Sequence, residues 1–206
     1  MRLSDMAAPH ETPNTAGGPT WPAVFLDRDG VINVDKSFVF RVADFQFAEG
    51  VLRILPEYVR QGYRIIVVTN QSGIGRGLFG PADFHRVSAW MQRRLAEHGA
   101  PVTAVYHCPH LPEDSCLCRK PAPGLLLRAA EQHQIDLGRS WLVGDRETDI
   151  EAGHRAGVPN TILLAADSAA TRAEHVCRRI EETLSVIPAV AGRSSADGRP
   201  LPALSR

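Results

Sequence analysis

Two carboxylates, Asp27 and Asp29, stand two residues apart directly after a short apolar run, residues 23–26. In an extended backbone, residues two apart point their side chains to the same side. Carboxylate oxygens, together with the phosphate oxygens of a substrate, are the ligands that Mg²⁺ prefers. The pair therefore predicts a site for a hard cation and a phosphate. Taken alone, Asp-Arg-Asp-Gly is more typical of an ordinary polar turn than of such a site.

Further polar groups in similar places favour the site over the turn. Thr69-Asn70 follows a second apolar run, Arg119-Lys120-Pro121 precedes a helical pattern, and residues 144–149, Gly-Asp-Arg-Glu-Thr-Asp, follow a third apolar run. Each segment alone could be a loop. Their order brings a hydroxyl, an ammonium and two more carboxylates to one crevice, which is the composition of a phosphoryl-transfer site.

A second cluster of ligand-type residues lies between residues 108 and 118. Cys108 and His110 are followed, after five residues, by Cys116 and Cys118. Three thiolates and an imidazole complete a tetrahedral Zn²⁺ site, and they leave no position open for a reacting water. We therefore predict a structural zinc that orders this loop, in preference to unligated cysteines. Cys177 stands apart and is expected to be a small buried apolar residue.

The elements that must position these groups alternate between strand and helix patterns. Such an alternation predicts an α/β fold of three layers, a Rossmann-like parallel sheet with helices on both faces, whose ligands bind at the carboxyl ends of the strands. The strands are predicted at residues 23–26, 64–69, 102–107, 141–143 and 161–164, and the helices at 51–62, 81–99, 125–134, 148–156 and 171–186.

Length and composition indicate one compact domain. Of the 206 residues, we assign 21–190 to the domain and 1–20 and 191–206 to flexible ends, which are rich in Pro, Gly and Ala and poor in large apolar side chains. The net charge of zero argues against binding nucleic acid. Because no apolar run has the length of a signal peptide or a membrane span, we expect a cytoplasmic protein without a membrane partner. We also expect a monomer that acts on a small phosphorylated metabolite.

Four ordered motifs, FLDRDG, VVTN, RKP and VGDRETD, resemble those of the haloacid dehalogenase superfamily of phosphatases. The resemblance implies that Asp27 is the nucleophile, which forms an aspartyl-phosphate, and that Asp29 is first the acid and then the base. It implies that Thr69 and Lys120 hold the transferring phosphoryl group. It also implies that Mg²⁺ is bound by Asp27, Asp145 and the backbone carbonyl of Asp29.

The zinc cluster and the RKP motif resemble one branch of that superfamily, the heptose bisphosphate phosphatases and the related histidinol phosphatases. Two segments are most similar to the heptose enzymes: residues 27–38, DRDGVINVDKSF, and residues 69–77, TNQSGIGRG. This resemblance implies removal of the 7-phosphate of D-glycero-D-manno-heptose 1,7-bisphosphate, a step of carbohydrate metabolism. The resemblance implies a substrate pocket formed by Asp35, Lys36, Ser37, Phe38, Thr69, Asn70, Gln71, Ser72, Arg119, Lys120 and Arg146.

Alternatives remain for the substrate. Phe38 stands where a tyrosine is usual and Arg146 where a lysine is frequent, and CPHLPEDSCLCRKP also resembles the histidinol phosphatases. One alternative is a histidinol-phosphate phosphatase, and another is a phosphatase that acts on a different small sugar phosphate. A third is a non-catalytic protein that binds a phosphate ligand. Only about forty residues separate Asp27 from Thr69, so we expect no large cap domain and a pocket closed by loops. The glycine-rich loop at residues 72–77 either offers backbone donors to the substrate or is only a flexible turn.

Overall fold

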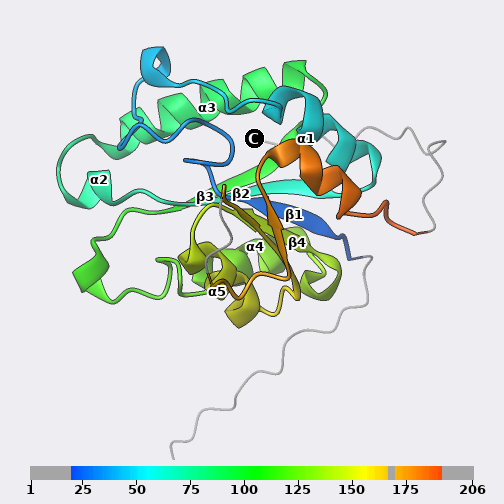
Figure 1. The fold of residues 1–206 in the computed structure, drawn as a ribbon. Coiled ribbons are helices and arrows are strands. Elements are labelled where there is room, and N and C mark those ends of the chain that lie inside the picture. The colour runs from blue at the N-terminus through cyan, green and yellow to red at the C-terminus, as the bar shows by residue number, and fades with distance from the viewer. Residues whose placement is uncertain (1–19, 167–169, 192–206) are drawn as a thin grey trace, which may run out of the picture.

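A computed structural model describes residues 20–166 and 170–191 as a six-stranded, fully parallel sheet with the strand order β3-β2-β1-β4-β5-β6 (Figure 1). The predicted three-layer α/β fold is therefore confirmed. The ends that were predicted to be flexible, 1–20 and 191–206, lie outside the described residues except for Thr20 and Ala191. The strands are β1 Ala23–Leu26, β2 Arg64–Asn70, β3 Val102–Cys108, β4 Trp141–Gly144, β5 Asn160–Leu164 and β6 His175–Cys177.

Helices cover both faces of the sheet (Figure 1). On one face lie α1 (Val51–Arg60), α3 (Pro81–Glu97) and the 3-10 helix η4 (Ile180–Ser185), and on the other lie α4 (Gly124–His133) and α5 (Glu147–Ala156). Short 3-10 turns stand at η1 (Val42–Asp44), η2 (Pro112–Asp114) and η3 (Leu137–Arg139). Across the two described ranges, no helix has both the length and the apolar character needed to cross a membrane.

The central strands are apolar throughout because each of their faces is buried. In β1, Val24 and Leu26 join the cluster under α1 and α3, whereas Ala23 and Phe25 join the cluster under α4 and α5. Alternate side chains of a strand point to opposite faces, so a strand covered on both sides shows a continuous apolar run. The core thus consists of two layers, one on each side of the sheet.

The strand order reverses direction between β1 and β4. From β1 the chain moves outward to β2 and β3, and it then returns to β4 on the other side of β1 before moving outward again to β5 and β6. At such a point the connections leave the sheet in opposite directions, and a crevice opens beyond the carboxyl ends of the two strands. The motifs after β1, β2 and β4 all meet at this edge. Between β1 and β2 the structure contains loops, η1 and α1, which confirms the absence of a large cap domain.

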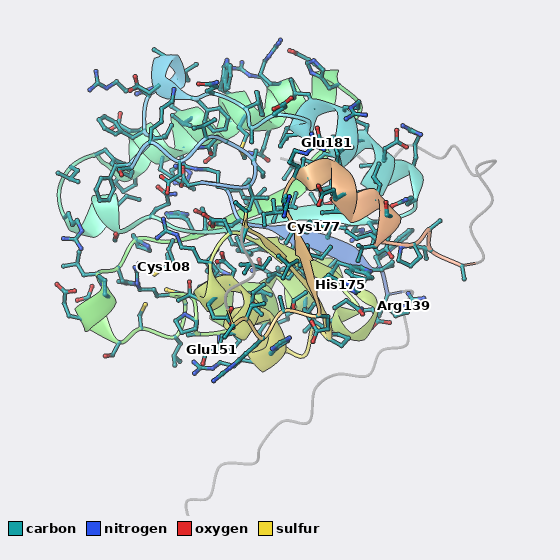
Figure 2. All side chains as sticks on the ribbon, in the orientation of Figure 1. Cys108, Arg139, Glu151, His175, Cys177 and Glu181 are labelled. Carbon is teal, nitrogen blue, oxygen red and sulfur yellow. The ribbon has the colours of Figure 1, made fainter. Side chains whose placement is uncertain are left out.

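The predicted helix over residues 171–186 is wrong. Residues 175–177 form β6, which extends the sheet by pairing Leu163 with Val176 and Leu164 with Cys177, and only residues 180–185 are helical, as a 3-10 helix. The edge of the sheet supplies backbone partners that a helix pattern in the sequence does not reveal. Cys177 is buried, as expected, and lies far from Cys108 (Figure 2).

The glycine-rich loop is also more regular than predicted, because residues 72–75 form a single helical turn, α2. A Cβ at Gly73 would come within 2.2 Å of the Phe79 ring, and a Cβ at Gly75 within 2.7 Å of the Pro109 carbonyl. The amide of Gly75 also donates to that carbonyl, at 3.0 Å. These two glycines therefore permit close packing, and the Gly75 amide already has a partner within the protein.

Candidate active site

A cavity of about 440 Å³ opens at the carboxyl edge of the sheet. The two predicted acidic residues after β1, most of the predicted substrate residues, and three residues at the start of α5 surround it. Its lining consists of Asp27, Asp29, Asp35, Ser37, Phe38, Asn70, Gln71, Ser72, Arg119, Lys120, Arg146, Glu147, Thr148 and Asp149. The polar groups that the sequence distributes over more than one hundred residues are therefore gathered around one space.

The floor of the cavity holds a buried cation between two carboxylates. The Nζ of Lys120 lies 2.9 Å from Oδ1 of Asp27 and 2.7 Å from Oδ1 of Asp149, and it donates to the carbonyl of Val68 at 2.7 Å. The side chain of Lys120 is only 2% exposed. An ammonium withdrawn from water is costly unless it is paired, and these three oxygens supply that pairing.

The backbone of Lys120 is fixed to β2 by a reciprocal pair of hydrogen bonds. Nδ2 of Asn70 donates to the Lys120 carbonyl, and the Lys120 amide donates to Oδ1 of Asn70, each at 3.1 Å. Asn70 is the last residue of β2. The sheet thus determines where the ammonium enters the cavity, although Lys120 itself lies in a loop.

Three carboxylates, those of Asp27, Asp145 and Asp149, offer oxygen atoms that all lie within 4.8 Å of one another. Burial raises the pKa of Asp27 to about 7, with Lys120 opposing this and Asp149 adding to it. Burial, followed by the charge of Asp149, likewise raises the pKa of Asp145 to about 6. Although burial alone would lower it, Asp149 and Asp27 raise the pKa of Lys120. The site therefore holds more negative charge than one lysine neutralises.

This arrangement fits a divalent cation. Oδ1 of Asp145 is buried and has no hydrogen-bond partner among the described residues, which is expected of an atom reserved for a metal. Gly30, with φ +87°, leaves room for that carboxylate, because a Cβ at this position would lie 2.2 Å from Oδ2 of Asp145. Hard oxygen donors of this kind suit Mg²⁺.

Asp29 lies beside this group and is held by several donors. Oδ2 accepts hydrogen bonds from Gln71 Nε2 at 2.8 Å and Arg28 Nη2 at 2.8 Å, and Oδ1 accepts one from Asn33 Nδ2 at 2.9 Å. Gln71 Nε2 also donates to Oγ1 of Thr69, at 2.9 Å. Asp29 faces the cavity, whereas Thr69 is 1% exposed and lies behind Gln71.

The rim of the cavity carries two guanidinium groups and a strained turn. Arg146 Nη2 pairs with Oδ2 of Asp35 at 2.9 Å, and Arg119 Nη1 donates to the His110 carbonyl at 3.3 Å. Ser37 and Phe38 both have positive φ, 56° and 54°, a conformation that is uncommon in residues other than glycine. Such strain is often found where a loop contacts a ligand.

The structure brings together nine of the eleven predicted substrate residues. Lys36 points away from the cavity, with its Nζ 3.5 Å from the Asp44 carbonyl, and Thr69 is not part of the lining. Conversely, Glu147 and Thr148 line the cavity without having been predicted as site residues, and Asp149, whose carboxylate was expected at the crevice, lines it as well. Asp149 follows Asp145 by one helical turn, which is the signal that identifies it as a neighbour of the site.

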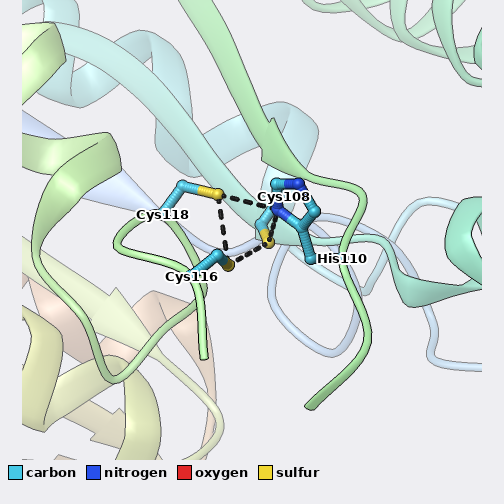
Figure 3. Close-up of side chains that lie close together, drawn as sticks. All are labelled: Cys108, His110, Cys116 and Cys118. Atoms are coloured by element: carbon cyan, nitrogen blue, oxygen red, sulfur yellow. Dashed lines mark hydrogen bonds between the residues drawn. The ribbon is translucent and has the colours of Figure 1, made fainter. Parts of the chain in front are cut away.

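The four predicted zinc ligands also converge (Figure 3). His110 Nδ1 lies 3.5 Å from Cys108 Sγ and 3.2 Å from Cys118 Sγ, and Cys116 Sγ lies 3.5 and 3.4 Å from the sulfurs of Cys108 and Cys118. Around a tetrahedral Zn²⁺ with ordinary bond lengths, such donors stand roughly 3.5–3.8 Å apart. Their type and number fit zinc, and their spacing of 3.2–3.5 Å is slightly tighter than that of such a site.

The cysteine loop adjoins the active site through its backbone. The amide of Gln71 donates to the Cys108 carbonyl at 2.7 Å, and Cys118 is followed directly by Arg119 and Lys120. Leu117, in the same loop, is 84% exposed, so this side chain contributes little apolar burial to the turn. Ligation by a metal would supply the missing constraint.

Known proteins resemble the chain over most of its length. A family model described as HAD-hydrolase-like matches residues 117–188. The chain is 41% identical over 167 residues to the D-glycero-beta-D-manno-heptose-1,7-bisphosphate 7-phosphatase of Helicobacter pylori (strain J99), with 80% of this chain and 96% of that protein covered. It is 43% identical over 177 residues to the corresponding alpha-heptose phosphatase of Burkholderia mallei, with 82% and 94% covered.

A solved structure leads to the same family. The D,D-heptose 1,7-bisphosphate phosphatase of B. bronchiseptica, crystallised with magnesium and phosphate, superposes with a TM-score of 0.72 at 32% identity, and the match covers 80% of this chain and 99% of that one. Its sheet and helices therefore follow the same course. The chain belongs to the haloacid dehalogenase-like hydrolases, within the family of the heptose-1,7-bisphosphate 7-phosphatases.

Proposed function

We propose that this protein is a magnesium-dependent phosphatase that removes the 7-phosphate of a D-glycero-D-manno-heptose 1,7-bisphosphate. The observation that supports this best is the cavity itself, in which Asp27 and Lys120 form the floor and Arg119 and Arg146 stand at the rim. The relatives at 41% and 43% identity bear the name of this activity.

In this proposal Asp27 attacks the phosphorus and becomes an aspartyl-phosphate. Its carboxylate projects from the end of β1 into the cavity, and its amide donates to the Val143 carbonyl at 3.1 Å, so its position is fixed by β4. Asp29 gives a proton to the leaving oxygen as the ester bond breaks, and it then takes a proton from the water that hydrolyses the intermediate. Lys120 offsets the negative charge of the transferring phosphoryl group.

The metal site would consist of Asp27, Asp145 and the backbone carbonyl of Asp29, with Asp149 holding Lys120 in place beside it. When bound there, Mg²⁺ supplies positive charge that allows an anionic nucleophile to approach an anionic phosphate. The crowding of Asp27, Asp145 and Asp149 supports this assignment. Burial, together with the charge of Asp149, raises the pKa of Asp27 and of Asp145, so without a cation the ionised form of each carboxyl is disfavoured. A bound cation would offset that cost. Thr69 acts from behind Gln71 by orienting its amide.

Two phosphates explain the charges at the two depths of the cavity. The phosphoryl group that is transferred lies over Lys120, and the second phosphate lies between Arg119 and Arg146, whose planar guanidinium groups bind phosphate oxygens in pairs. Arg146 then exchanges its ion pair with Asp35 for the phosphate. Histidinol phosphate would instead bring a cationic amine to the same guanidinium groups, which repel it.

Zinc in the cluster of Cys108, His110, Cys116 and Cys118 has a structural role in this proposal. All four tetrahedral positions are taken by protein atoms, so none remains for substrate or water. We further propose that the enzyme acts as a monomer, in the cytoplasm, on a soluble sugar substrate. Sedimentation at micromolar concentration checks the oligomeric state.

The deciding experiment compares kcat/KM, with and without magnesium, for both anomers of heptose 1,7-bisphosphate, for histidinol phosphate and for p-nitrophenyl phosphate. We expect a magnesium requirement on every substrate and the highest value on a heptose bisphosphate. The anomer that is preferred assigns the chain to the alpha or the beta enzymes. A higher value on histidinol phosphate would replace the substrate assignment, and turnover without magnesium would contradict the mechanism.

A further inference from the structure

Arg28 is a buried charge placed in the sequence between Asp27 and Asp29. Its side chain is 0% exposed. A guanidinium in such a place is costly unless its donors are paired. Arg28 Nη2 lies 2.8 and 2.9 Å from the two carboxylate oxygens of Asp29, and its Nε lies 3.1 Å from one of them. Asp29 thus accepts hydrogen bonds from Nε and Nη2 of this buried guanidinium, whereas Nη1 has no partner among the described residues.

The same guanidinium also contacts two other elements. Nη2 donates to the carbonyl of Val39 at 2.9 Å, and the guanidinium carbon lies 5.8 Å from the centre of the Phe84 ring in α3. Val39 directly follows the turn that brings Ser37 and Phe38 to the cavity. Arg28 therefore joins Asp29, the substrate-facing turn and α3 at a single buried point.

Asp29 itself sits at the border between this buried anchor and the cavity. Its side chain is 18% exposed, and Asn33 and Gln71 donate to the two oxygens from other directions. Proton transfer requires the acid to lie within hydrogen-bond reach of the oxygen that it protonates. A carboxylate at the surface of a cavity keeps such a position only if its neighbours fix its rotamer.

We propose that Arg28 is a positioning residue for acid catalysis, which holds the Asp29 carboxylate toward the leaving oxygen and sets its distance from the turn at residues 37–39. This inference rests on the proposed function, in which Asp29 donates the proton as the bond between phosphorus and the leaving oxygen breaks and the bond to Asp27 forms. Only arginine has the planar fork that can grip both carboxylate oxygens and still reach a third acceptor.

A role in positioning the acid has a signature that a purely structural role lacks. Phenyl phosphate and p-nitrophenyl phosphate differ little in shape, but p-nitrophenolate leaves readily without a proton, whereas phenolate benefits from one. Loss of the acid's orientation therefore slows the first ester much more than the second. The ratio kcat/KM is the right quantity, because it covers the steps up to departure of the leaving group and excludes hydrolysis of the intermediate.

The experiment measures both esters at saturating magnesium with the wild type, Arg28→Met, Arg28→Lys and, as a reference for loss of the acid, Asp29→Asn. Arg28→Lys keeps a positive charge and most of the buried volume, so it remains informative if Arg28→Met does not fold. For both Arg28 variants we expect kcat/KM to fall about 100-fold on phenyl phosphate and less than about fivefold on p-nitrophenyl phosphate, within the range of acid–base catalysis. Asp29→Asn should show the same selectivity.

Tyr58→Phe is the matched control for a loss of buried hydrogen bonding. It removes the 2.5 Å contact between Tyr58 of α1 and Thr183 of η4, neither of which lines the cavity, and should leave the ratio of the two esters unchanged. Equal losses on both esters in folded Arg28 variants, or no loss, would overturn the inference. If Asp29→Asn lacks the selectivity while the wild type is active, the proposed role of Asp29 fails with it. If the wild type hydrolyses no ester with magnesium, the proposed function itself fails.

Discussion

Removing magnesium should make the stability of the protein depend on pH through Asp27. In the folded, metal-free protein, burial raises the pKa of this carboxyl to about 7, whereas in the unfolded chain the ordinary value of 3.8 applies. Between these values the folded state holds a proton that the unfolded state has lost. Stability therefore falls as the pH rises through this interval, which is opposite to the behaviour of a carboxylate in a simple ion pair.

The size of the effect follows from the two pKa values. Between pH 5 and pH 7, one group with these values lowers the free energy of unfolding by about 2 kcal/mol. Asp145, whose pKa is raised to about 6, acts in the same direction. His107 and His133 act in the opposite direction, because burial lowers the pKa of each imidazole. The free energy of unfolding of the wild type is therefore compared with that of Asp27→Asn at each pH. Because both proteins contain Asp145, His107 and His133, the contributions of these groups cancel in the difference.

The assay is urea unfolding at pH 5, 6 and 7, in magnesium-free buffer and in excess magnesium. No chelator is added, because it would also remove zinc. Relative to Asp27→Asn, the wild type should lose about 2 kcal/mol between pH 5 and pH 7 without magnesium, and this loss should shrink when magnesium binds the ionised carboxylates. Parallel pH profiles for the two proteins, or a loss that magnesium leaves unchanged, would refute the reasoning.

Three further predictions concern activity and metal content. Asp27→Asn should abolish magnesium-dependent turnover while zinc content and the far-ultraviolet circular dichroism spectrum remain those of the wild type, and turnover clearly above background would remove Asp27 from the role of nucleophile. Metal analysis should find about one zinc per chain in the wild type. Cys116→Ser should lose most of that zinc together with activity, because the loop leads directly into Arg119 and Lys120; full activity without zinc would show that the loop and the site are independent. Arg119→Ala should lower kcat/KM on heptose bisphosphate about 10- to 100-fold through lost charged hydrogen bonds, with little change on p-nitrophenyl phosphate, and equal losses would contradict a second phosphate site.

The sequence was sufficient for the central strands and for the ligand clusters. Runs such as residues 64–69 are readable because strands buried on both faces must be apolar throughout, and the polar motifs mark their ends. The four ligands of the cysteine cluster are close in sequence, so their spacing already limits their geometry. These features depend on local information, which a single sequence contains.

Features that depend on tertiary contacts could not be predicted. The edge strand β6 forms because β5 offers unpaired backbone groups to His175–Cys177, and the sequence of that segment equally suits a helix. The positions of Thr69 behind Gln71, and of Lys36 outside the cavity, depend on how side chains from β2 and the β1 loop pack together. The burial of Arg28 is likewise invisible, since an arginine between two aspartates in a sequence resembles any solvated charge.

The reversal of strand order between β1 and β4 has a consequence for how such an enzyme changes over evolution. The groups that the reaction needs are fixed by the sheet, and Lys120, at their centre, is 2% exposed, whereas Arg146, at the rim, is 65% exposed. Under the proposed function, substitutions at the rim would alter which molecule enters and would leave the buried charges in place. The topology thus places the residues of the reaction and the residues of substrate recognition in different parts of the cavity. Related proteins could then evolve to act on new metabolites while they keep the same reaction chemistry.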